Sequence, residues 1–307
     1  MPSRVLATLV TVGILACGCA STAGAEGHRG GSGSGRTVPG GSPATPDATP
    51  SEAVAAAAAI AGFRTEVDAA AAGFVGDVDR LQSAVDRGSL LAARSDQLAA
   101  QADFDRFRLL QTGDATTAST LDELATDVGA GQTFGGLHAV ERDLWTPGLT
   151  PAAATADAAT DLSGLVAQAP VAEYLLAREV LDPEAIGTTA VSELGWVDGT
   201  AIPGREEQYS HLDGVDIAAT VSAAHDAFGD IEPLGHQVAP TLTASVASSF
   251  DRLEAEVARL GPPATVVDGD ISPATRLGLS QQVDATAAVL ARLAALLVPF
   301  GTAGPPS

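Results

Sequence analysis

Apolar side chains recur at helical spacing along most of this chain. From Ser51 onward they fall three or four residues apart, or at sums of these intervals, which is the period of a helix with one buried face. The first such stripe contains Val54, Phe63, Val67, Phe74, Val78, Leu81 and Val85. Further stripes run from Val238 to Leu260 and from Val283 to Leu297. The pattern predicts long amphipathic helices, with the second helix running from about Ser89 to Gln111.

Capping residues and prolines mark the ends of the later helices. Thr150-Pro151, Asp182-Pro183 and Ser272-Pro273 each place a capping side chain before a proline at the first helical position. Gly261-Pro262-Pro263 and Pro299 are typical of helix ends. These signals predict separate helices joined by connections.

Little of the chain alternates with the period of two that strands require. The segment "ATVVDGDI", beginning at Ala264, could pass for a strand but is isolated. The polar, glycine-punctuated section from about Gly187 to Arg205 predicts a long irregular segment, and such segments inside a domain are usually functional or disordered. We therefore predict an all-α domain of antiparallel helical bundles.

The N-terminus has the pattern of an export signal. Arg4 precedes "VLATLVTVGILA", an apolar stretch that is short for a membrane span and ends just before Cys17 and Cys19. This resembles a bacterial lipoprotein signal, in which a cysteine becomes the lipidated first residue. Ile14 and Ala16 occupy the apolar and small positions before Cys17, which favours Cys17 over Cys19. An ordinary secretory signal with two incidental cysteines is the alternative.

The chain accordingly divides into four predicted parts. Residues 1–16 are the lipoprotein signal peptide, and residues 17–50 are the lipidated cysteine and a flexible Gly/Ser/Pro-rich tether. Residues 51–300 are the helical domain, and residues 301–307 are a disordered tail. Both cysteines lie in the first two parts, so the helical domain has neither a disulfide nor a thiolate metal ligand.

Composition narrows the class of protein further. Hydrophobic residues make up 46% of the 307 residues but aromatic residues only 4%, so Ala, Leu and Val must fill the interior, as in closely packed helices. The net charge of -22 argues against a nucleic-acid partner, because the phosphate backbone would be repelled. An acidic surface instead favours the approach of cations.

His138 and Glu141 form the most informative polar pair. Three residues apart on a helix, they share one face, so an imidazole nitrogen and a carboxylate oxygen could converge on one ion. A solvated pair on the wet side of the helix is the alternative. Arg142 and Asp143 follow Glu141, so the zinc motif with a second histidine one turn away is not present.

The context of this pair resembles a known family. Gly136 to Glu141, followed by Leu144 and Trp145, resembles a Gly-x-His-x-x-Glu motif with an apolar-aromatic pair after it. Glu206 to Asp213 resembles a Glu-Glu-x-x-Tyr-Ser-His-x-Asp segment, here one residue shorter. Both motifs, in this order, are found in imelysin-like proteins, specifically the EfeO/EfeM type of periplasmic iron-uptake lipoprotein.

The resemblance covers roughly Ser51 to Pro299 and implies two packed four-helix bundles. We expect the tether to stand in place of the N-terminal cupredoxin domain that some members carry. The family's third motif, Tyr-Glu-Arg-Ile-Glu-Pro, corresponds to Phe104 to Leu109, which puts Asp105 on the first glutamate but Arg108 on the second. If Arg108 points into the site, it should weaken cation binding by repulsion.

The resemblance also implies which residues bind a metal. The implied ligands are His138, Glu141, Glu206, Asp105 and Asp122. Glu207, Tyr209, His211 and Asp213 would orient these ligands. Carboxylates with one imidazole suit an iron ion (Fe²⁺ or Fe³⁺), or alternatively Zn²⁺ or Mn²⁺.

Less specific interpretations of single residues stay open. Asp105 and Asp122 could be ordinary surface or capping acids, and the acids at Glu206 could be a charged helix start. Tyr209, Trp145 and Trp196 could be packing aromatics. His225 and His236 lack motif context and predict solvated or capping side chains.

Three functions compete. The first is a lipid-anchored metal-binding protein in the cell envelope, on the outer side of the cytoplasmic membrane, which captures iron and passes it to a membrane permease without doing chemistry itself. A haem peroxidase is a further expected partner of such a system. The second is a metal-dependent peptidase-like hydrolase, because relatives of imelysin have been classed as peptidases. The third is a binding module for an envelope polysaccharide or protein.

Overall fold

The computed structural model of the protein describes residues 48–108, 120–126, 128–129 and 133–300. These residues form helices and turns and contain no β-strand, which confirms the predicted all-α class. Cys17, the tether up to residue 47 and the tail at residues 301–307 lie outside the described residues. The signal peptide and the lipidation of Cys17 therefore stay predictions.

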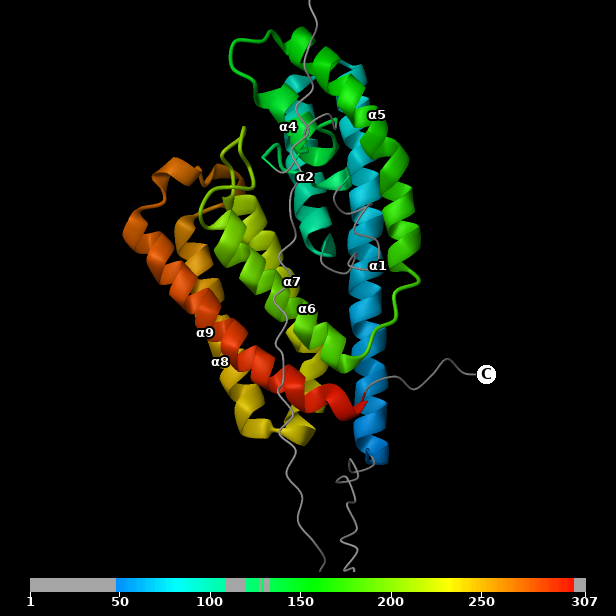
Figure 1. The fold of residues 1–307 in the computed structure, drawn as a ribbon, viewed down its shortest axis with the longest axis vertical. Helices are drawn as coiled ribbons and strands as arrows, with labels where there is room; N and C mark the ends of the chain where they lie inside the picture. The colour runs from blue at the N-terminus through cyan, green and yellow to red at the C-terminus, as the bar shows by residue number, and fades with distance from the viewer. Residues whose placement is uncertain (1–47, 109–119, 127, 130–132, 301–307) are drawn as a thin grey trace, which may run out of the picture. The chain divides into compact units, whose positions relative to one another are not determined.

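Four helices between residues 50 and 176 pack on one another (Figure 1). They are α1 (Pro50–Asp86), α2 (Leu90–Asp105), α4 (Gly136–Trp145) and α5 (Pro151–Leu176). α1 begins in a capping box, in which Thr49 and Glu52 each accept a hydrogen bond from the other's backbone N–H. The short α1–α2 connection makes these two helices antiparallel neighbours.

Four helices from the second half form a second group. They are α6 (Pro183–Trp196), α7 (Gly214–Val238), α8 (Pro240–Leu260) and α9 (Pro273–Leu297). The predicted caps are confirmed: Thr150, Asp182 and Ser272 each accept a hydrogen bond from a first-turn N–H of α5, α6 and α9. α7 packs against both α1 and α2 and so joins the groups, in agreement with two packed four-helix bundles.

Two expectations about the chain path are wrong. The section from Gly187 to Arg205 is mostly helical, because α6 continues to Trp196 and a π-helical turn follows at Val197–Ala201. The irregular segment is shorter and lies later, between Ile202 and Asp213. α2 ends at Asp105, earlier than predicted, and Gln111 lies outside the described residues. The sequence at Ala264 forms two 3₁₀ turns, Pro263–Thr265 and Asp268–Asp270.

An aromatic cluster fixes the end of α2. The rings of Phe74, Phe104 and Phe107 are fully buried and lie with their centroids 5.3, 5.6 and 5.7 Å apart. Such tilted and edge-on pairs add to the stabilisation that apolar burial gives. Because Phe104 and Phe107 alternate with Asp105 and Arg108, this packing holds both charged side chains in place.

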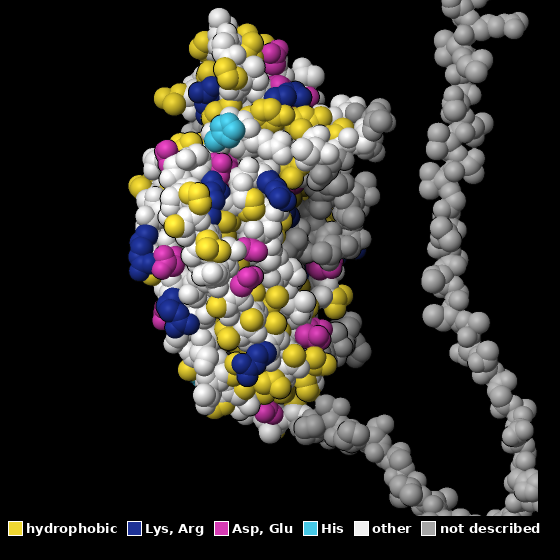
Figure 2. Space-filling view, turned by 60° about the vertical axis from the view of Figure 1, so that its left-hand side comes forward, with side chains coloured by type: hydrophobic (Ala, Val, Ile, Leu, Met, Phe, Trp, Pro, Cys, Tyr) yellow, Lys and Arg dark blue, Asp and Glu magenta, His cyan; other side chains and the backbone are white. Residues whose placement is uncertain are grey.

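The surface carries both signs of charge. Figure 2 shows arginine and acidic side chains interspersed among apolar ones on one face, so the acidic excess of the chain is not gathered into a single patch there.

The helix from Pro273 to Phe300, near the C-terminus, is long and apolar enough to cross a membrane by length and composition alone. One face of α9 packs on α6 and α8, so its apolar residues have partners within the described part of the protein.

Candidate metal centre

His138 and Glu141 point into the protein. His138 is 1% exposed and Glu141 is 0% exposed, and His138 Nδ1 lies 3.2 Å from Glu141 Oε2. α4 carries both side chains on its inner face, as the spacing of three predicts. The alternative of a solvated pair on the wet side of a helix is therefore excluded for these two residues.

Gly136 lets α4 begin directly against an earlier segment. Its φ is +75°, and an added Cβ would lie 2.4 Å from the Leu121 carbonyl oxygen and 2.7 Å from that of Thr120. Only glycine accepts this backbone conformation and this approach together. The approach brings Asp122 to His138, with Asp122 Oδ1 3.2 Å from His138 Nε2. The glycine of the motif thus has a positional role in the site.

The turn between Glu206 and Asp213 supplies carboxylates from the second half of the chain. Glu206 Oε1 lies 3.4 Å from His138 Nε2. Asp213 Oδ1 accepts hydrogen bonds from the backbone N–H groups of Glu206 at 3.2 Å and Glu207 at 3.4 Å, which fixes the turn. Asp213 therefore holds the backbone that carries Glu206 and Glu207, and its orienting role toward a metal stays a prediction.

The same turn also holds Glu141. Glu141 Oε1 accepts hydrogen bonds from the backbone N–H groups of Tyr209 at 2.8 Å and Ser210 at 2.6 Å. The predicted orienting role of Tyr209 thus rests on its backbone. His211 has an exposed side chain and a positive φ of 59°, and its backbone N–H donates to the Glu207 carbonyl oxygen. His211 shapes the turn through its backbone, with its imidazole at the surface.

Arg108 points into the cluster. Arg108 Nη1 donates to Asp105 Oδ1 at 3.1 Å, and Nη2 donates to Glu193 Oε2 at 3.1 Å. Gln101 Nε2 donates to both Asp105 Oδ1 and Asp122 Oδ1 at 3.2 Å. Asp105 and Asp122 are therefore part of a buried polar network, and the reading of them as ordinary surface acids is wrong.

Two sets of ligand atoms are close enough to share one ion. Asp122, His138 and Glu206 form one set, and His138, Glu141 and Glu207 form the other, with ligand atoms within 4.8 Å of one another in each. His138 belongs to both. Glu207, predicted to orient the ligands, thus lies at a ligand position itself, whereas Asp105 belongs to neither set and pairs with Arg108.

The chemistry of this set fits a hard or borderline cation. Carboxylate oxygens with one imidazole are the ligands that iron, manganese and zinc ions accept. His138 Nε2 and Glu206 Oε1 are buried and have no hydrogen bond of regular geometry among the described residues. Buried polar atoms are nearly always paired, so atoms left in this state are expected where a ligand completes the site.

The charges in the cluster shift one another's pKa values. Burial alone would lower the pKa of the His138 imidazole, but the carboxylates of Asp122, Glu141 and Glu206 raise it well above its ordinary value. For Asp122, burial is outweighed by His138 and Arg108, and the pKa is lowered. Burial raises the pKa of Glu206 to about 7 and that of Asp105 to about 6. The imidazolium of His138 and the guanidinium of Arg108 therefore balance the ionised acids.

Two buried acids of this region were missed by sequence reasoning. Glu193 on α6 is 3% exposed and pairs with Arg108. Asp216 on α7 is fully buried, and burial together with the charges of Glu207 and Asp105 raises its pKa well above the usual range. Asp216 follows the acid-rich Glu206–Asp213 stretch, which was the available signal. Glu193 stands in the section taken as irregular and gave none.

The remaining polar and aromatic candidates have local partners. Trp196 lies under Arg108, whose guanidinium carbon is 3.3 Å from the ring centroid, and Trp145 packs against the core. His225 Nδ1 lies 2.6 Å from Glu254 Oε1. His236 is exposed and pairs with Glu232 at 3.4 Å, in agreement with the solvated side chain predicted for it.

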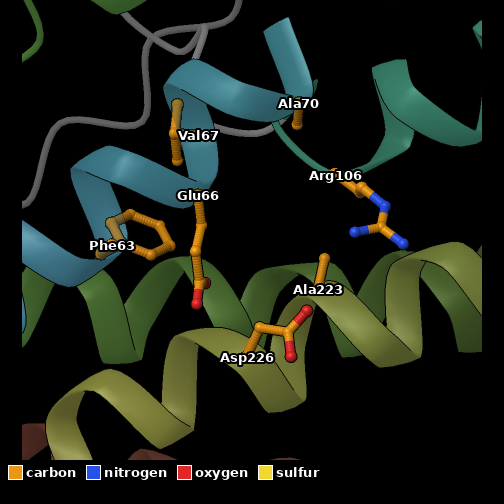
Figure 3. A pocket seen from close by; sticks show the side chains of 7 residues that line it. All are labelled: Phe63, Glu66, Val67, Ala70, Arg106, Ala223 and Asp226. Carbon is orange, nitrogen blue, oxygen red and sulfur yellow. The ribbon is translucent and has the colours of Figure 1, made fainter. Parts of the chain in front are cut away.

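A small cavity lies between α1 and α7, apart from the predicted ligands. Figure 3 shows Glu66 of α1 pointing toward α7, and Asp226 of α7 turned to the side on which Arg106 lies. Its volume of about 30 Å³ has room for ordered water. Burial and the charges of Asp230 and Asp226 raise the pKa of Glu66 to about 7. The cavity is too small for a substrate.

A comparison with protein families matches most of the chain. A family model described as Imelysin (Peptidase_M75) matches residues 59–298, a range that includes every predicted ligand. No curated protein matches the chain.

Proposed function

Because the chain belongs to the imelysin family, we propose that it is an extracytoplasmic cation-binding protein of an iron-uptake system, of the EfeO/EfeM type. It captures an iron ion at the buried cluster around His138 and passes the ion to a membrane permease. His138, Glu141 and Glu206 bind the ion, Asp122 and Glu207 complete the set, and Asp105 supports it through Arg108.

One observation carries the proposal. Carboxylates from three separated segments, at Asp122, Glu141 and Glu206, converge on the single imidazole of His138 inside a helical scaffold. Burying so many ionisable groups disfavours folding unless charges compensate one another. A cation-binding role gives this arrangement a reason that packing does not.

The cluster holds a proton where the ion would bind. Close carboxylates keep His138 protonated, and an imidazolium cannot ligate a metal. Ion capture at His138 therefore releases a proton, and ion release takes one up. Such an exchange reduces the gain in charge on binding by one unit, which suits a carrier that must load and unload.

The N-terminal sequence supports a proposed position in the cell envelope. We infer that lipid on Cys17 anchors the chain to the outer side of the cytoplasmic membrane, with residues 17–50 as the tether. The partners in this proposal are a membrane permease and a haem peroxidase of the same uptake system. Lipid labelling of the full chain, compared between Cys17→Ala and Cys19→Ala, tests which cysteine is used.

A peptidase is the second candidate, because the matching family carries that word in its name. A metallopeptidase needs an open metal position and room for a peptide. His138, Glu141 and Glu206 are each at most 2% exposed. Their burial favours a carrier of a small ion over an enzyme acting on a polypeptide. Hydrolysis of a peptide library by wild type, abolished by Glu141→Gln, would reverse this preference.

Cation titration of the purified full chain tests the proposal directly. Fe²⁺ under anaerobic conditions, with Mn²⁺ and Zn²⁺ for comparison, should bind wild type, and His138→Ala should weaken binding by at least about tenfold. His236→Ala is the matched control, because His236 also pairs with a glutamate on a helix but faces solvent. Equal binding by wild type and His138→Ala would remove the basis of the proposal.

A further inference from the structure

Arg108 is surrounded by acids from four segments of the chain. Its guanidinium donates to Asp105 on α2 and Glu193 on α6, and Nη1 lies 3.8 Å from Glu206 Oε1 and 4.0 Å from Asp122 Oδ2. The side chain is 7% exposed and lies over the ring of Trp196. Charged side chains are almost never fully buried unless paired, and this arginine has four acids within 4.0 Å.

Asp122 and Glu206 face two positive positions at once. Asp122 presents Oδ2 to Arg108 Nη1 and Oδ1 to His138 Nε2, at 4.0 and 3.2 Å. Glu206 Oε1 lies 3.8 Å from Arg108 Nη1 and 3.4 Å from His138 Nε2. The two carboxylates therefore bridge a position at Arg108 and a position at His138.

The position at Arg108 has the surroundings of a cation site. Nη1 stands among oxygens of Asp105, Asp122 and Glu206, and hard divalent ions prefer such carboxylate oxygens. The guanidinium differs from an ion in being covalently tethered and permanently charged. Its stacking on Trp196 and its hydrogen bond to Glu193 keep it in this place.

We propose that Arg108 is an internal counter-ion that occupies the second of two cation positions, so that the protein takes up a single cation, at His138. This inference rests on the proposed function. The tethered guanidinium offsets the charge of Asp105, and on one side it also offsets the bridging carboxylates of Asp122 and Glu206, without a bound ion. It also repels a cation at the neighbouring position, which limits both the number and the charge of the ions held.

Removing the guanidinium charge should open the second position. In the full chain, Arg108→Gln should bind two Mn²⁺ ions where wild type binds one, or bind one ion at least about tenfold more tightly. Without added metal, Arg108→Gln should unfold at a lower temperature than wild type, because the acids lose their partner. Added Mn²⁺ should raise the Tm of Arg108→Gln by more than it raises the Tm of wild type. Isothermal titration and thermal unfolding measure these effects.

Two further variants keep the test decisive. Arg106→Gln is the matched control, because Arg106 is exposed and two residues away on the same turn, and it should change neither stoichiometry nor metal rescue. If Arg108→Gln does not fold, Arg108→Gln combined with Glu193→Gln removes one positive and one negative charge together. That double variant should fold and still gain the second Mn²⁺ position.

The outcomes separate this inference from the proposed function. One ion bound with equal affinity by wild type and Arg108→Gln overturns the inference and leaves the proposed function standing. No ion bound by wild type but one bound by Arg108→Gln overturns iron capture by this chain and the single uptake at His138, although it places Arg108 in a cation position. No ion bound by either protein overturns both.

Discussion

Gly136→Ala is the substitution that tests the construction of the site most directly. Gly136 has a φ of +75°, a left-handed conformation that disfavours any residue with a Cβ. A Cβ at this position would lie 2.4 Å from the carbonyl oxygen and 2.6 Å from the carbonyl carbon of Leu121. Those atoms belong to the backbone, so no side chain can move aside to relieve the contact.

The expected loss of stability follows from these two effects. A left-handed backbone costs a residue other than glycine about 1–2 kcal/mol. Forcing extra volume into a packed region costs a further amount of about 1–3 kcal/mol. We therefore expect the free energy of unfolding of Gly136→Ala to fall by about 2–5 kcal/mol. A change of 1 kcal/mol lowers the Tm of a domain of this size by about 2–4 °C.

The same substitution should disturb the cluster. Pushing the segment at Leu121 away from α4 separates Asp122 from His138, whose closest atoms are 3.2 Å apart. The pKa of His138 should fall, because Asp122 is one of the carboxylates that raise it, and NMR titration of the imidazole measures this. Mn²⁺ affinity should weaken by about tenfold or more, because Asp122 would no longer lie within reach of the ion.

Gly135→Ala is the control for this experiment. Gly135 has extended backbone angles, and a Cβ there would meet no atom within 4 Å. Its unfolding free energy should change by less than about 0.5 kcal/mol. Denaturant unfolding in which both variants match wild type, with an unchanged His138 pKa, would refute the argued role of Gly136.

The remaining predictions concern pH. Glu66→Gln should raise the Tm at pH 8 and leave it unchanged at pH 4. Burial and the charges of Asp230 and Asp226 raise the pKa of the Glu66 carboxyl to about 7. The ionisation of Glu66 therefore destabilises the folded state as pH rises through that value, and glutamine removes this effect. Solvent screening limits the gain to about 1 kcal/mol or less. Calorimetry measures the Tm at both pH values, with Asp68→Asn on the same helix as the control. An equal rise in the Tm of Glu66→Gln at pH 4 and pH 8 would contradict the reasoning. Mn²⁺ affinity of wild type should weaken by up to about tenfold per pH unit as pH falls, because His138 must release its proton, and coincident titration curves at pH 6 and pH 8 would exclude this exchange.

The helical period predicted most of the fold, and its failures have physical reasons. Helices with clear caps, such as those beginning after Thr150, Asp182 and Ser272, start where the sequence places them. Glycines and polar residues interrupt the section from Gly187, and this pattern predicts an irregular segment. In the helix that forms there, Gly187 packs closely on α9, where a Cβ would lie 2.8 Å from that of Ala294, and this close approach accounts for a glycine at the position. A contact between residues so far apart in sequence leaves no local signal.

The site was predictable where local spacing decides geometry. The spacing of three between His138 and Glu141 was enough to place both on one helix face. The convergence of Asp122 and Glu206 came from the resemblance of their motifs, because no local rule brings such distant segments together. The orientation of Arg108 could not be read from the sequence at all. It depends on Glu193 and Trp196, which lie in α6 and reach the cluster only through tertiary packing.

The balance of charge in the cluster connects stability with function. Replacing buried ion pairs by apolar side chains of similar volume is often neutral or stabilising, so a core under selection for stability alone would not need these acids. Phe104 and Phe107, beside Asp105 and Arg108, show that apolar side chains fit this part of the fold. The metal-free cluster is tolerated because Arg108 and protonated His138 offset its acids. Of these two charges only the proton of His138 can leave, which is why the proposed function places cation entry and release at His138 and not at Arg108.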